Sequence, residues 1–357
     1  MIRFLARHRF VISGIVVALM IAGFIYLAIQ TRNIRISEYD GNTYPGVAFG
    51  TAVKKTFYME NEENREAVNK SVDEVLKQLD DRISYRNKNS ELAAINKIYI
   101  VDGVTNVSQD IAEYISREIE ISNETDGAFS PCILPLSRLW GIEEGNTSIP
   151  SDSDIKNVCS LIDPSNIEAV DGGVIFHKEG MGIDFGAVGK GIAADIVLKE
   201  LADKKVPGGV VAIGGTIAVY GDKGKKKPWH IGIQDPRGVD GDMLGVLTVP
   251  GGYVISTSGD YEKYFDLDGK RYHHIFDPNT GYPADSGLIS VTISSEDGFL
   301  SDAMSTACFV MGLEKGMQYA EEKGVDAIFV TSDKKVYITN DLKKRFNIKA
   351  EGYELAN

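Results

Sequence analysis

The chain has 357 residues, enough for one large domain or two smaller ones, and its 43% hydrophobic and 25% charged residues are typical of a folded protein with a sizeable core. The net charge is −13, and residues 1–35 hold five arginines and no acidic residue, so the rest of the chain has 33 basic and 51 acidic residues. Such an acidic body argues against a nucleic-acid-binding surface and suits a divalent cation better. The three cysteines lack the close spacing of a zinc knuckle or a disulfide scaffold, and we expect Cys132, Cys159 and Cys308 to be small packing residues.

The N-terminal segment is predicted to be a membrane anchor. Residues 11–29 form an almost unbroken apolar run, just long enough for a helix to cross ~30 Å of hydrocarbon. Arginines stand on both sides, with more before the run than after it, which favours a cytoplasmic N-terminus. No small-x-small cleavage site and no lipobox cysteine is found, so an uncleaved signal anchor is favoured over a cleaved signal peptide. We therefore expect an anchor over residues 1–30, a tether over 31–48 and an extracytoplasmic body over 49–357.

A strand and two helices are predicted in the first part of the body. Residues 51–59 are typical of a strand, and Asn61 caps a helix whose apolar residues recur at three- and four-residue steps. A loop is expected over residues 81–92. Ser108 then begins a second helix, and a turn-rich segment follows over residues 125–140.

The second part of the body alternates strands and helices. Residues 182–185 are typical of a strand and 190–201 of a helix, and residues 210–220 form a Val/Ile-rich strand in which Gly214-Gly215 indicates a bulge or a close approach of a ligand. Further strands are predicted over residues 229–234, 246–249, 253–257, 288–294, 327–331 and 335–338, and further helices over 301–311 and 314–323. This order predicts an α+β or mixed α/β body without clean βαβ repetition.

The first candidate for chemistry is the glycine-rich segment 182–191, which leads from a predicted strand into a helix. Glycines allow a backbone to approach a ligand closely, and the free N–H groups at a helix N-terminus suit an anion, to which Lys190 would add a positive charge. The glycine spacing is neither that of a Walker A loop nor that of G-x-G-x-x-G. Taken alone, the segment fits a phosphate site and an ordinary tight turn with a surface lysine equally well.

Asp302 and Thr306 are the second candidate. They stand four residues apart on a predicted helix, so both side chains project from one face. A carboxylate and a hydroxyl are hard oxygen donors suited to Mg²⁺, which also takes phosphate oxygens. The alternative is purely structural: Asp302 would stabilise the N-terminus of its own helix, and the Thr306 hydroxyl would hydrogen-bond to a backbone carbonyl one turn earlier.

A histidine pair is the third candidate. His273 and His274 stand close to Asp277, and a histidine near a carboxylate is a candidate general base. Adjacent residues of an extended segment point to opposite sides, so only one of the two histidines is expected to face a site. Weaker candidates are Ser84-Tyr85 and residues 126–129, which could bring an aromatic surface to a flat ring.

Taken in chain order, these segments resemble one family, the ApbE-type FAD:protein FMN transferases, which attach FMN to proteins. The resemblance runs from about residue 49 to about residue 312, and the number and order of its short motifs make the joint match specific. The matching elements are Ser84-Tyr85, Ser90-Glu-Leu, Asn96, Thr125-Asp-Gly-Ala-Phe129, Leu139-Trp-Gly141, Asp184-Phe-Gly-Ala-Val-Gly-Lys-Gly191, Asp195, Ile213-Gly-Gly215, Pro228-Trp229, Ile233-Gln-Asp-Pro236, Ser256-Thr-Ser-Gly-Asp-Tyr261, His274-Ile-Phe-Asp-Pro-Asn-Thr-Gly-Tyr-Pro283, Ser290-Val-Thr292, Asp302 and Thr306.

The resemblance implies a single large mixed α+β body with mixed and antiparallel sheets and flanking helices. It also implies a reaction in which FAD is split at its pyrophosphate, FMN passes to a Ser or Thr hydroxyl of a target protein through a phosphoester bond, and AMP leaves. Mg²⁺ would neutralise the charge that develops on the phosphates. Positioning and electrostatics are expected to supply most of the rate.

The family's functional residues can be carried over by position. The implied metal ligands are the side chains of Asp302 and Thr306 and the backbone carbonyl of Ala187. The implied catalytic residues are His274, which we expect to help deprotonate the acceptor hydroxyl, and Asp302; His273 would be the outward-facing neighbour. Contacts to the flavin nucleotide are expected from Phe49, Tyr85, Ala128, Phe129, Ser130, Asp184, Lys190, Thr257 and Phe276.

The chain departs from the family pattern at two of these positions. Ser130 stands where the family often has Asp after Gly-Ala-Phe, which puts that one contact in question. Gly189 stands where the family often has Ala before Lys-Gly, and this change is expected to be harmless because only the backbone is needed there.

Other functions fit parts of the same pattern. A Mg²⁺-dependent FAD pyrophosphatase would use the same metal site, with water in place of the protein hydroxyl. A non-catalytic, membrane-tethered flavin-binding protein would not need Asp302, Thr306 and His274, and a thiol-based redox enzyme is disfavoured because no C-x-x-C occurs. The partner expected for the transferase is an acceptor flavoprotein domain, either in a membrane electron-transfer subunit or in a secreted flavoprotein, and no nucleic acid.

Overall fold

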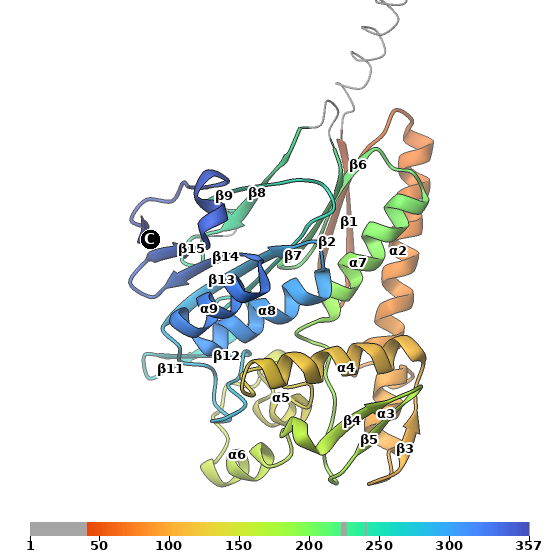
Figure 1. Ribbon diagram of the computed structural model, residues 1–357, viewed down its shortest axis with the longest axis vertical. Helices are drawn as coiled ribbons and strands as arrows, with labels where there is room; N and C mark the ends of the chain where they lie inside the picture. The colour runs from red at the N-terminus through yellow and green to blue at the C-terminus, as the bar shows by residue number, and fades with distance from the viewer. Residues whose placement is uncertain (1–40, 223–226, 240, 357) are drawn as a thin grey trace, which may run out of the picture.

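A nine-stranded sheet runs through the upper part of the molecule (Figure 1). This computed structural model describes residues 41–222, 227–239 and 241–356. Neighbouring strands of the sheet are antiparallel, except that β15 and β17 run parallel. The strands, in spatial order, are β1 (Gly41–Ala48), β2 (Thr51–Tyr58), β6 (Gly208–Ile213), β7 (Thr216–Gly221), β10 (Val254–Gly259), β13 (Leu288–Ser295), β14 (Asp326–Thr331), β15 (Lys335–Ile338) and β17 (Glu354–Leu355).

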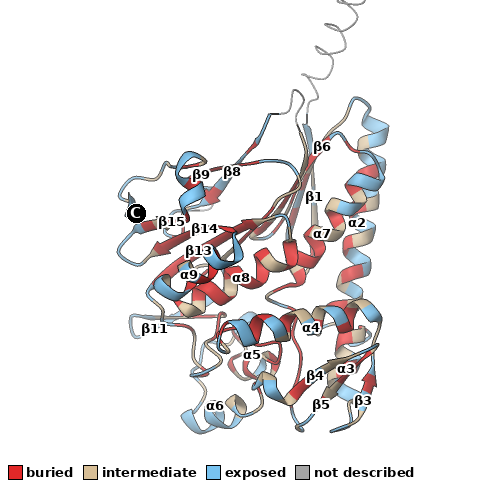
Figure 2. Cartoon of the chain, viewed as in Figure 1, coloured by how far each residue is buried: buried red, intermediate tan, exposed pale blue. Residues whose placement is uncertain are grey.

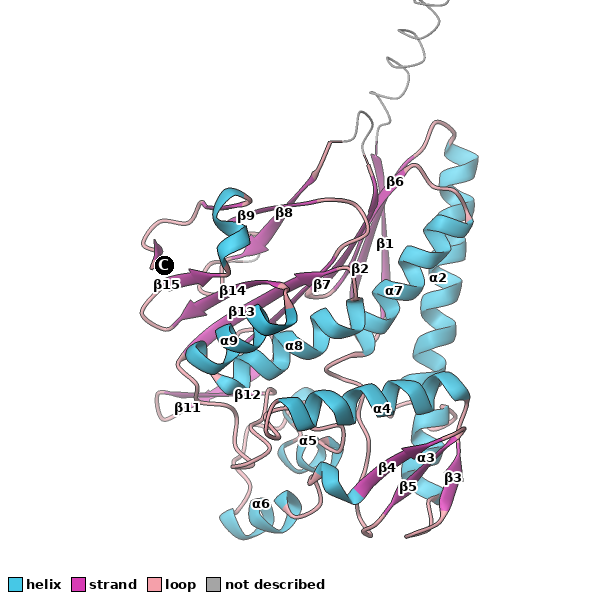
Figure 3. Cartoon of the chain, in the orientation of Figure 1, coloured by secondary structure: helices cyan, strands magenta, loops and turns pink. Residues whose placement is uncertain are grey.

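Both faces of this sheet are covered, which is how a sheet of this size becomes buried. Helices α7 (Gly189–Asp203), α8 (Gly298–Met311) and α9 (Leu313–Lys323) lie on one face, and α2 (Glu62–Ile83) packs beside α7 (Figure 3). The other face packs on a small sheet of β8 (Trp229–Gln234), β9 (Met243–Val249) and β16 (Phe346–Ile348). The central strand β13 is accordingly buried along nearly its whole length.

The lower part of the molecule is a cluster of short elements around α4 (Figure 2). Its core is continuous with that of the sheet, because Ile115 of α4 (Gln109–Glu124) and Phe176 of β5 (Gly173–Phe176) belong to the same buried cluster as Phe57 of β2. A hairpin of β11 (Tyr264–Leu267) and β12 (Lys270–His273) connects β10 to β13. The other elements of this part are α3 (Glu91–Ile98), β3 (Val104–Asn106), α4 (Gln109–Glu124), α5 (Leu134–Trp140), η1 (Ile142–Glu144), α6 (Asp152–Cys159), η2 (Pro164–Asn166), β4 (Ile167–Val170) and β5 (Gly173–Phe176).

The strongly periodic elements formed where the sequence predicted them. Strand β8 has the predicted bounds, and α2 begins after Asn61, whose side chain accepts a hydrogen bond from the amide of Glu63 (2.8 Å). Ser108 is the N-cap of α4, as expected. The mixed α+β architecture is confirmed, with short elements such as η3 (Asn340–Lys344) between the long ones. All three cysteines have free thiols, and Cys132 and Cys308 are buried as packing residues.

Several local predictions were wrong for identifiable reasons. Residues 41–48, expected to be tether, form β1, because they pair along their whole length with β2. The expected strand 210–220 is two strands, since Gly214 (φ 54°) allows the tight turn of a β6–β7 hairpin.

The segment 182–185 is also not a strand. The backbone N–H and C=O of Ile183 pair with the side-chain amide of Asn96 (2.7 and 2.8 Å) instead of with a neighbouring strand. The expected loop over 81–92 is shorter than predicted, because α2 continues to Ile83 and α3 begins at Glu91. Two short strands, β16 and β17, follow the last strand that was predicted.

The predicted anchor over residues 11–29 lies outside the described residues. Within the part of the chain that the structure describes, no helix combines the length and the apolar character needed to span a bilayer.

Glu118, in the middle of α4, is a buried acid without a counter-charge. Neither of its carboxyl oxygens hydrogen-bonds to any residue that the structure describes. Burial raises the pKa of Glu118 well above its ordinary value, and the charge of Asp184 adds to the effect. The folded protein therefore retains a proton that the unfolded chain loses, so stability falls as the pH rises above the ordinary glutamate pKa.

We expect Glu118→Met to raise the free energy of unfolding by about 1–3 kcal/mol at about pH 8, because it removes a buried polar group that has no partner. The gain in stability should be smaller at about pH 5, because protonating Glu118 on folding costs less free energy at a pH close to the ordinary glutamate pKa. Urea unfolding at both pH values measures the difference. Glu120→Gln, at an exposed position of the same helix, is the control and should change little at either pH. An equal gain for Glu118→Met at both pH values would contradict a neutral buried carboxyl.

Candidate functional site

A cavity of about 470 Å³, a size common for small-molecule sites, opens where the upper and lower parts meet. Twelve of the thirteen site residues expected from the sequence line it, although they come from segments spread over more than two hundred positions. They are Phe49, Tyr85, Ala128, Phe129, Ser130, Asp184, Ala187, Lys190, Thr257, His274, Phe276 and Thr306. Their gathering in one cavity is a finding, while their roles remain predictions.

Asp302 is the thirteenth residue, and it lies behind the cavity wall with 3% of its surface exposed. The backbone amide of Gly191 donates to its Oδ2 (2.9 Å), and the Thr216 hydroxyl donates to its Oδ1 (3.2 Å). Helix α7 has Val188 at its N-cap and so lacks a side-chain cap of its own. The carboxylate of α8 therefore satisfies and electrostatically favours the N-terminus of α7.

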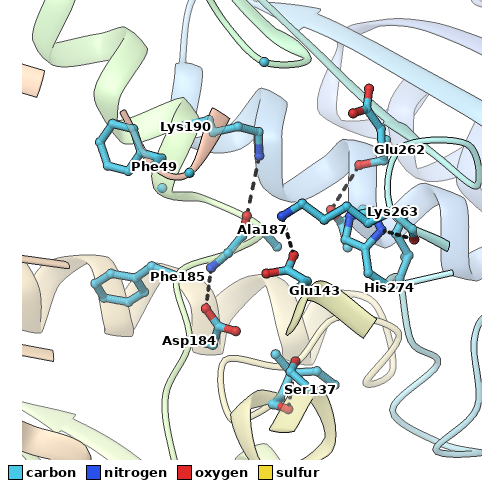
Figure 4. Close-up of a pocket in the computed structure, with 18 of the residues that line it drawn as sticks. Phe49, Ser137, Glu143, Asp184, Phe185, Ala187, Lys190, Glu262, Lys263 and His274 are labelled. Carbon is cyan, nitrogen blue, oxygen red and sulfur yellow. Dashed lines mark hydrogen bonds and ion pairs between the residues drawn. The ribbon is translucent and has the colours of Figure 1, made fainter. Parts of the chain in front are cut away.

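Lys190 completes this cluster from the first turn of α7. Its Nζ lies 3.3 Å from Oδ1 of Asp302, and it donates to the carbonyl of Gly186 (3.5 Å) (Figure 4). The ammonium thus sits between the buried carboxylate and the cavity, in the place where the local charge favours a cation. The lysine gives this end of the cavity a positive charge that suits a phosphate, whereas the amides of Gly189 and Gly191 are already bonded to Phe185 and Asp302.

Thr306 and Ala187 bring further oxygen atoms to the cavity. The Thr306 hydroxyl lies 3.2 Å from that of Ser258, which also contacts Ser305 (2.8 Å). Among the residues that the structure describes, no three His, Cys, Asp or Glu side chains gather to hold a metal. The donors expected from the sequence are the Asp302 carboxylate behind the wall, the Thr306 hydroxyl and the Ala187 carbonyl, which are hard oxygen ligands that fit Mg²⁺ better than zinc.

His274 follows β12 and faces the cavity. Its Nδ1 lies 3.2 Å from the carbonyl oxygen of Lys263, and its backbone amide donates to that same oxygen (3.1 Å). Since a carbonyl only accepts, Nδ1 carries the proton and Nε2 is left as a free base. Burial lowers the pKa of His274 to about 4, against the opposing charge of Glu143, so the imidazole is neutral at pH 7.

His273 turns away from the cavity, but it does not face outward as expected. Its side chain is buried, with Nε2 3.1 Å from the carbonyl oxygen of Ala284 and the ring edge-on to Phe309. Burial lowers the pKa of His273. We therefore assign His273 to the core.

Asp184 and Ser130 form part of the polar floor. The amide of Gly186 donates to Oδ1 of Asp184 (2.7 Å), while burial raises the pKa of Asp184 to about 6. The Ser130 hydroxyl donates to the carbonyl of Ile162 (2.8 Å) and accepts from the amide of Cys132 (3.2 Å). Ser130 thus uses its hydroxyl to hold the local backbone, which leaves little of it for a ligand.

Aromatic rings supply flat surfaces around the cavity. The ring of Tyr85 lies against the guanidinium of Arg86, 4.3 Å from ring centroid to Cζ. Phe49 sits at the β1–β2 turn with φ 52°, held by its amide, which donates to Asp80 (3.1 Å). Phe276 packs against Trp140.

An ion-pair cluster in the cavity wall was missed by sequence reasoning. Glu143 of η1 contacts Nζ of Lys263 (2.8 Å) and the guanidinium of Arg86. Burial alone would raise the pKa of Glu143, but Lys263, His274 and Arg86 outweigh it and lower that pKa to about 2. Glu143 stands two positions after the Leu139-Trp-Gly141 motif, but nothing in the sequence signals that it meets a lysine 120 positions later.

Comparisons with known proteins agree with one another. The family model of the ApbE family matches residues 49–329. The FAD:protein FMN transferase of Klebsiella pneumoniae (strain 342) is 32% identical over 316 residues, which cover 88% of this chain and 96% of that protein. The crystal structure of the ApbE protein from Thermotoga maritima has a TM-score of 0.78 and 31% identity, covering 86% of this chain and 99% of its own. The flavin transferase ApbE from Vibrio cholerae has a TM-score of 0.77 and 26% identity, with coverages of 86% and 99%.

We expect Gly191→Ala to lower the free energy of unfolding by about 1–3 kcal/mol, because α7 and α8 touch at this residue. An added Cβ would lie 2.1 Å from the carbonyl oxygen of Gly298 and 2.8 Å from Cβ of Asp302, so the two helices would have to separate. Gly189→Ala is the matched control, since its Cβ would meet only Cδ1 of Ile83 at 3.4 Å. Urea unfolding compares the two variants, and equal losses would contradict the close helix contact.

Proposed function

The chain belongs to the ApbE family, and we propose that it is an FAD:protein FMN transferase that passes FMN from FAD to a Ser or Thr hydroxyl of a target protein and releases AMP. The observation that carries the proposal is that a neutral imidazole, a lysine and the oxygen donors Thr306 and Ala187 line one cavity, with the Asp302 carboxylate directly behind that lysine. This combination suits phosphoryl-type transfer, in which positioning and electrostatics supply the rate.

The phosphate-binding end of the cavity is formed by the first turn of α7. Lys190 in that turn would exchange its contact with Asp302 for one with the pyrophosphate of FAD. Asp302, Thr306 and the carbonyl of Ala187 would hold Mg²⁺, which when bound would neutralise charge on the phosphate oxygens. The contacts of Asp302 with Gly191 and Thr216 already fix the direction of that carboxylate.

His274 would act at the acceptor hydroxyl. The hydroxyl oxygen forms the new bond to the FMN phosphorus as the bridging P–O bond to AMP breaks, and Nε2 of His274 takes the hydroxyl proton. The carbonyl of Lys263 holds the Nδ1 proton and so keeps Nε2 available. Phe49, Tyr85 and Phe276 would bound the flat parts of the dinucleotide.

The transferase is tested with full-length protein, FAD, Mg²⁺ and candidate acceptor domains. We expect mass spectrometry to find FMN on a Ser or Thr of the acceptor, with one AMP released per FMN attached. His274→Ala should slow this transfer about 10²- to 10⁴-fold, the usual contribution of a general base. His230→Ala is the matched control, because His230 is exposed on β8 and does not line the cavity.

The same reactions distinguish the alternative functions. Free FMN and AMP without a covalent product would favour the pyrophosphatase, in which water replaces the hydroxyl. Bound FAD that stays intact with every acceptor would favour a flavin-binding protein. An unchanged rate of FMN transfer in His274→Ala would contradict the role of His274 as the general base.

We also propose that the body is tethered outside the cytoplasm by residues 11–29, on the strength of their apolar run and flanking arginines. In bacterial cells the full-length chain should fractionate with membranes, and protease added to intact spheroplasts should digest the body. A chain without residues 1–40 should be found in the soluble fraction. Digestion only after lysis would contradict the external placement.

A further inference from the structure

Glu143 is connected to His274 through a single residue, Lys263. The Lys263 ammonium contacts Oε1 of Glu143 (2.8 Å). The Lys263 carbonyl oxygen accepts hydrogen bonds from both Nδ1–H and the backbone amide of His274. In Figure 4, Glu143 and Lys263 point toward each other beside the imidazole. The other oxygen of Glu143 meets Arg86, so both oxygens of the carboxylate have cationic partners.

This contact joins the two parts of the molecule at the cavity. Glu143 belongs to η1 in the lower part, whereas Lys263 lies in the loop between β10 and β11. The Glu143 side chain is 25% exposed, so its ion pair is less screened than a typical surface pair. The side chain of the neighbouring Glu144 is 51% exposed, and its ion pair is with Arg86 and not with Lys263.

Among the described residues, the charged groups with the largest effect on the imidazole include one acid, Glu143. They are Glu143 from η1, Lys263 from the β10–β11 loop and the adjacent His273 of β12. Burial lowers the pKa of His274, Lys263 lowers it further, and Glu143 opposes both. Glu143 itself remains ionised, because its own pKa is about 2.

We propose that Glu143 is a positioning residue for His274: it anchors Lys263, whose carbonyl fixes the imidazole tautomer, and its negative charge stabilises the imidazolium that forms when Nε2 takes the acceptor's proton. The inference rests on the proposed transferase function. Glu143 gives up no proton and forms no bond in the step; the proton moves from the acceptor hydroxyl to Nε2 alone.

The matched control is Glu124, which also bridges the two parts by an ion pair. Its Oε1 lies 2.6 Å from Nζ of Lys323, and its side chain is 31% exposed, but it joins α4 to α9 and does not line the cavity. Glu124→Gln therefore removes an ion pair of similar burial without reaching His274. A purely structural role for Glu143 would make the two Gln variants behave alike.

In full-length protein we expect Glu143→Gln to lower kcat for FMN transfer about 10- to 100-fold, as loss of a supporting group often does, with little change in the KM for FAD. Removing the negative charge lowers the pKa of His274, so the acid limb of the kcat/KM profile should move to lower pH. Glu143→Asp should restore part of kcat, while Glu124→Gln should leave both parameters unchanged. A pH profile and kcat like those of the unsubstituted protein would overturn the inference while leaving the transferase standing.

A double substitution tests whether Glu143 acts through His274. If it does, adding Glu143→Gln to His274→Ala should cause no further loss, whereas independent roles would give multiplied losses and overturn the inference. NMR titration of the His274 ring gives a readout that needs no turnover, and its pKa should be lower in Glu143→Gln than in the unsubstituted protein. If no acceptor is ever modified, the transferase proposal fails, whatever the role of Glu143. If the pKa of His274 is then also unchanged in Glu143→Gln, the effect of Glu143 on the imidazole is refuted as well.

Discussion

The site depends on the close contact between α7 and α8, which satisfy each other's N-termini. Asp302 of α8 accepts from the Gly191 amide of α7, and Asp195 of α7 accepts from the amides of Gly298 (2.7 Å) and Phe299 (3.0 Å) at the start of α8. The exchange requires backbones in near contact, which only glycine permits at positions 191 and 298. Burial raises the pKa of Asp195 to about 6 in spite of these bonds. The two amides therefore offset only part of the free-energy cost of burying the carboxylate.

This reciprocal capping places the functional groups of the cavity. It fixes Asp302 beside the first turn of α7, which in turn sets Lys190 and the carbonyl of Ala187 on the same side. The lower part then closes the space with Tyr85, Asp184 and the Glu143 cluster. The basic residues that line the cavity, Arg86, Lys190 and Lys263, are each held by a carboxylate, so their positions are fixed before any ligand enters.

Much of the fold was predictable because amphipathic periodicity and capping residues act locally, as for α2 after Asn61 and for β8. The errors arose where a pairing partner decides the structure. Residues 41–48 become β1 because they pair with β2, the next strand of a local hairpin, and Ile183 is held by Asn96, 87 residues away, instead of by a strand. The residues of the site were found through ordered motifs, while the Glu143–Lys263 pair leaves no local signal, since either residue alone looks like an ordinary surface charge.

The basicity of His274 presents a conflict that the cavity itself can resolve. An imidazole with a pKa of about 4 is always unprotonated at neutral pH, but it is also a weak base, and a catalytic base works best with a pKa near the working pH. Because burial is the main cause of the low value, any negative charge brought into the cavity acts on the imidazole with little screening. A bound pyrophosphate would supply such charge, and the part that Lys190 and Mg²⁺ leave unneutralised would add to the effect of Glu143. Bound substrate would therefore raise the basicity of His274 when the reaction needs it. In the empty cavity the histidine would stay neutral and hydrogen-bonded to the carbonyl of Lys263.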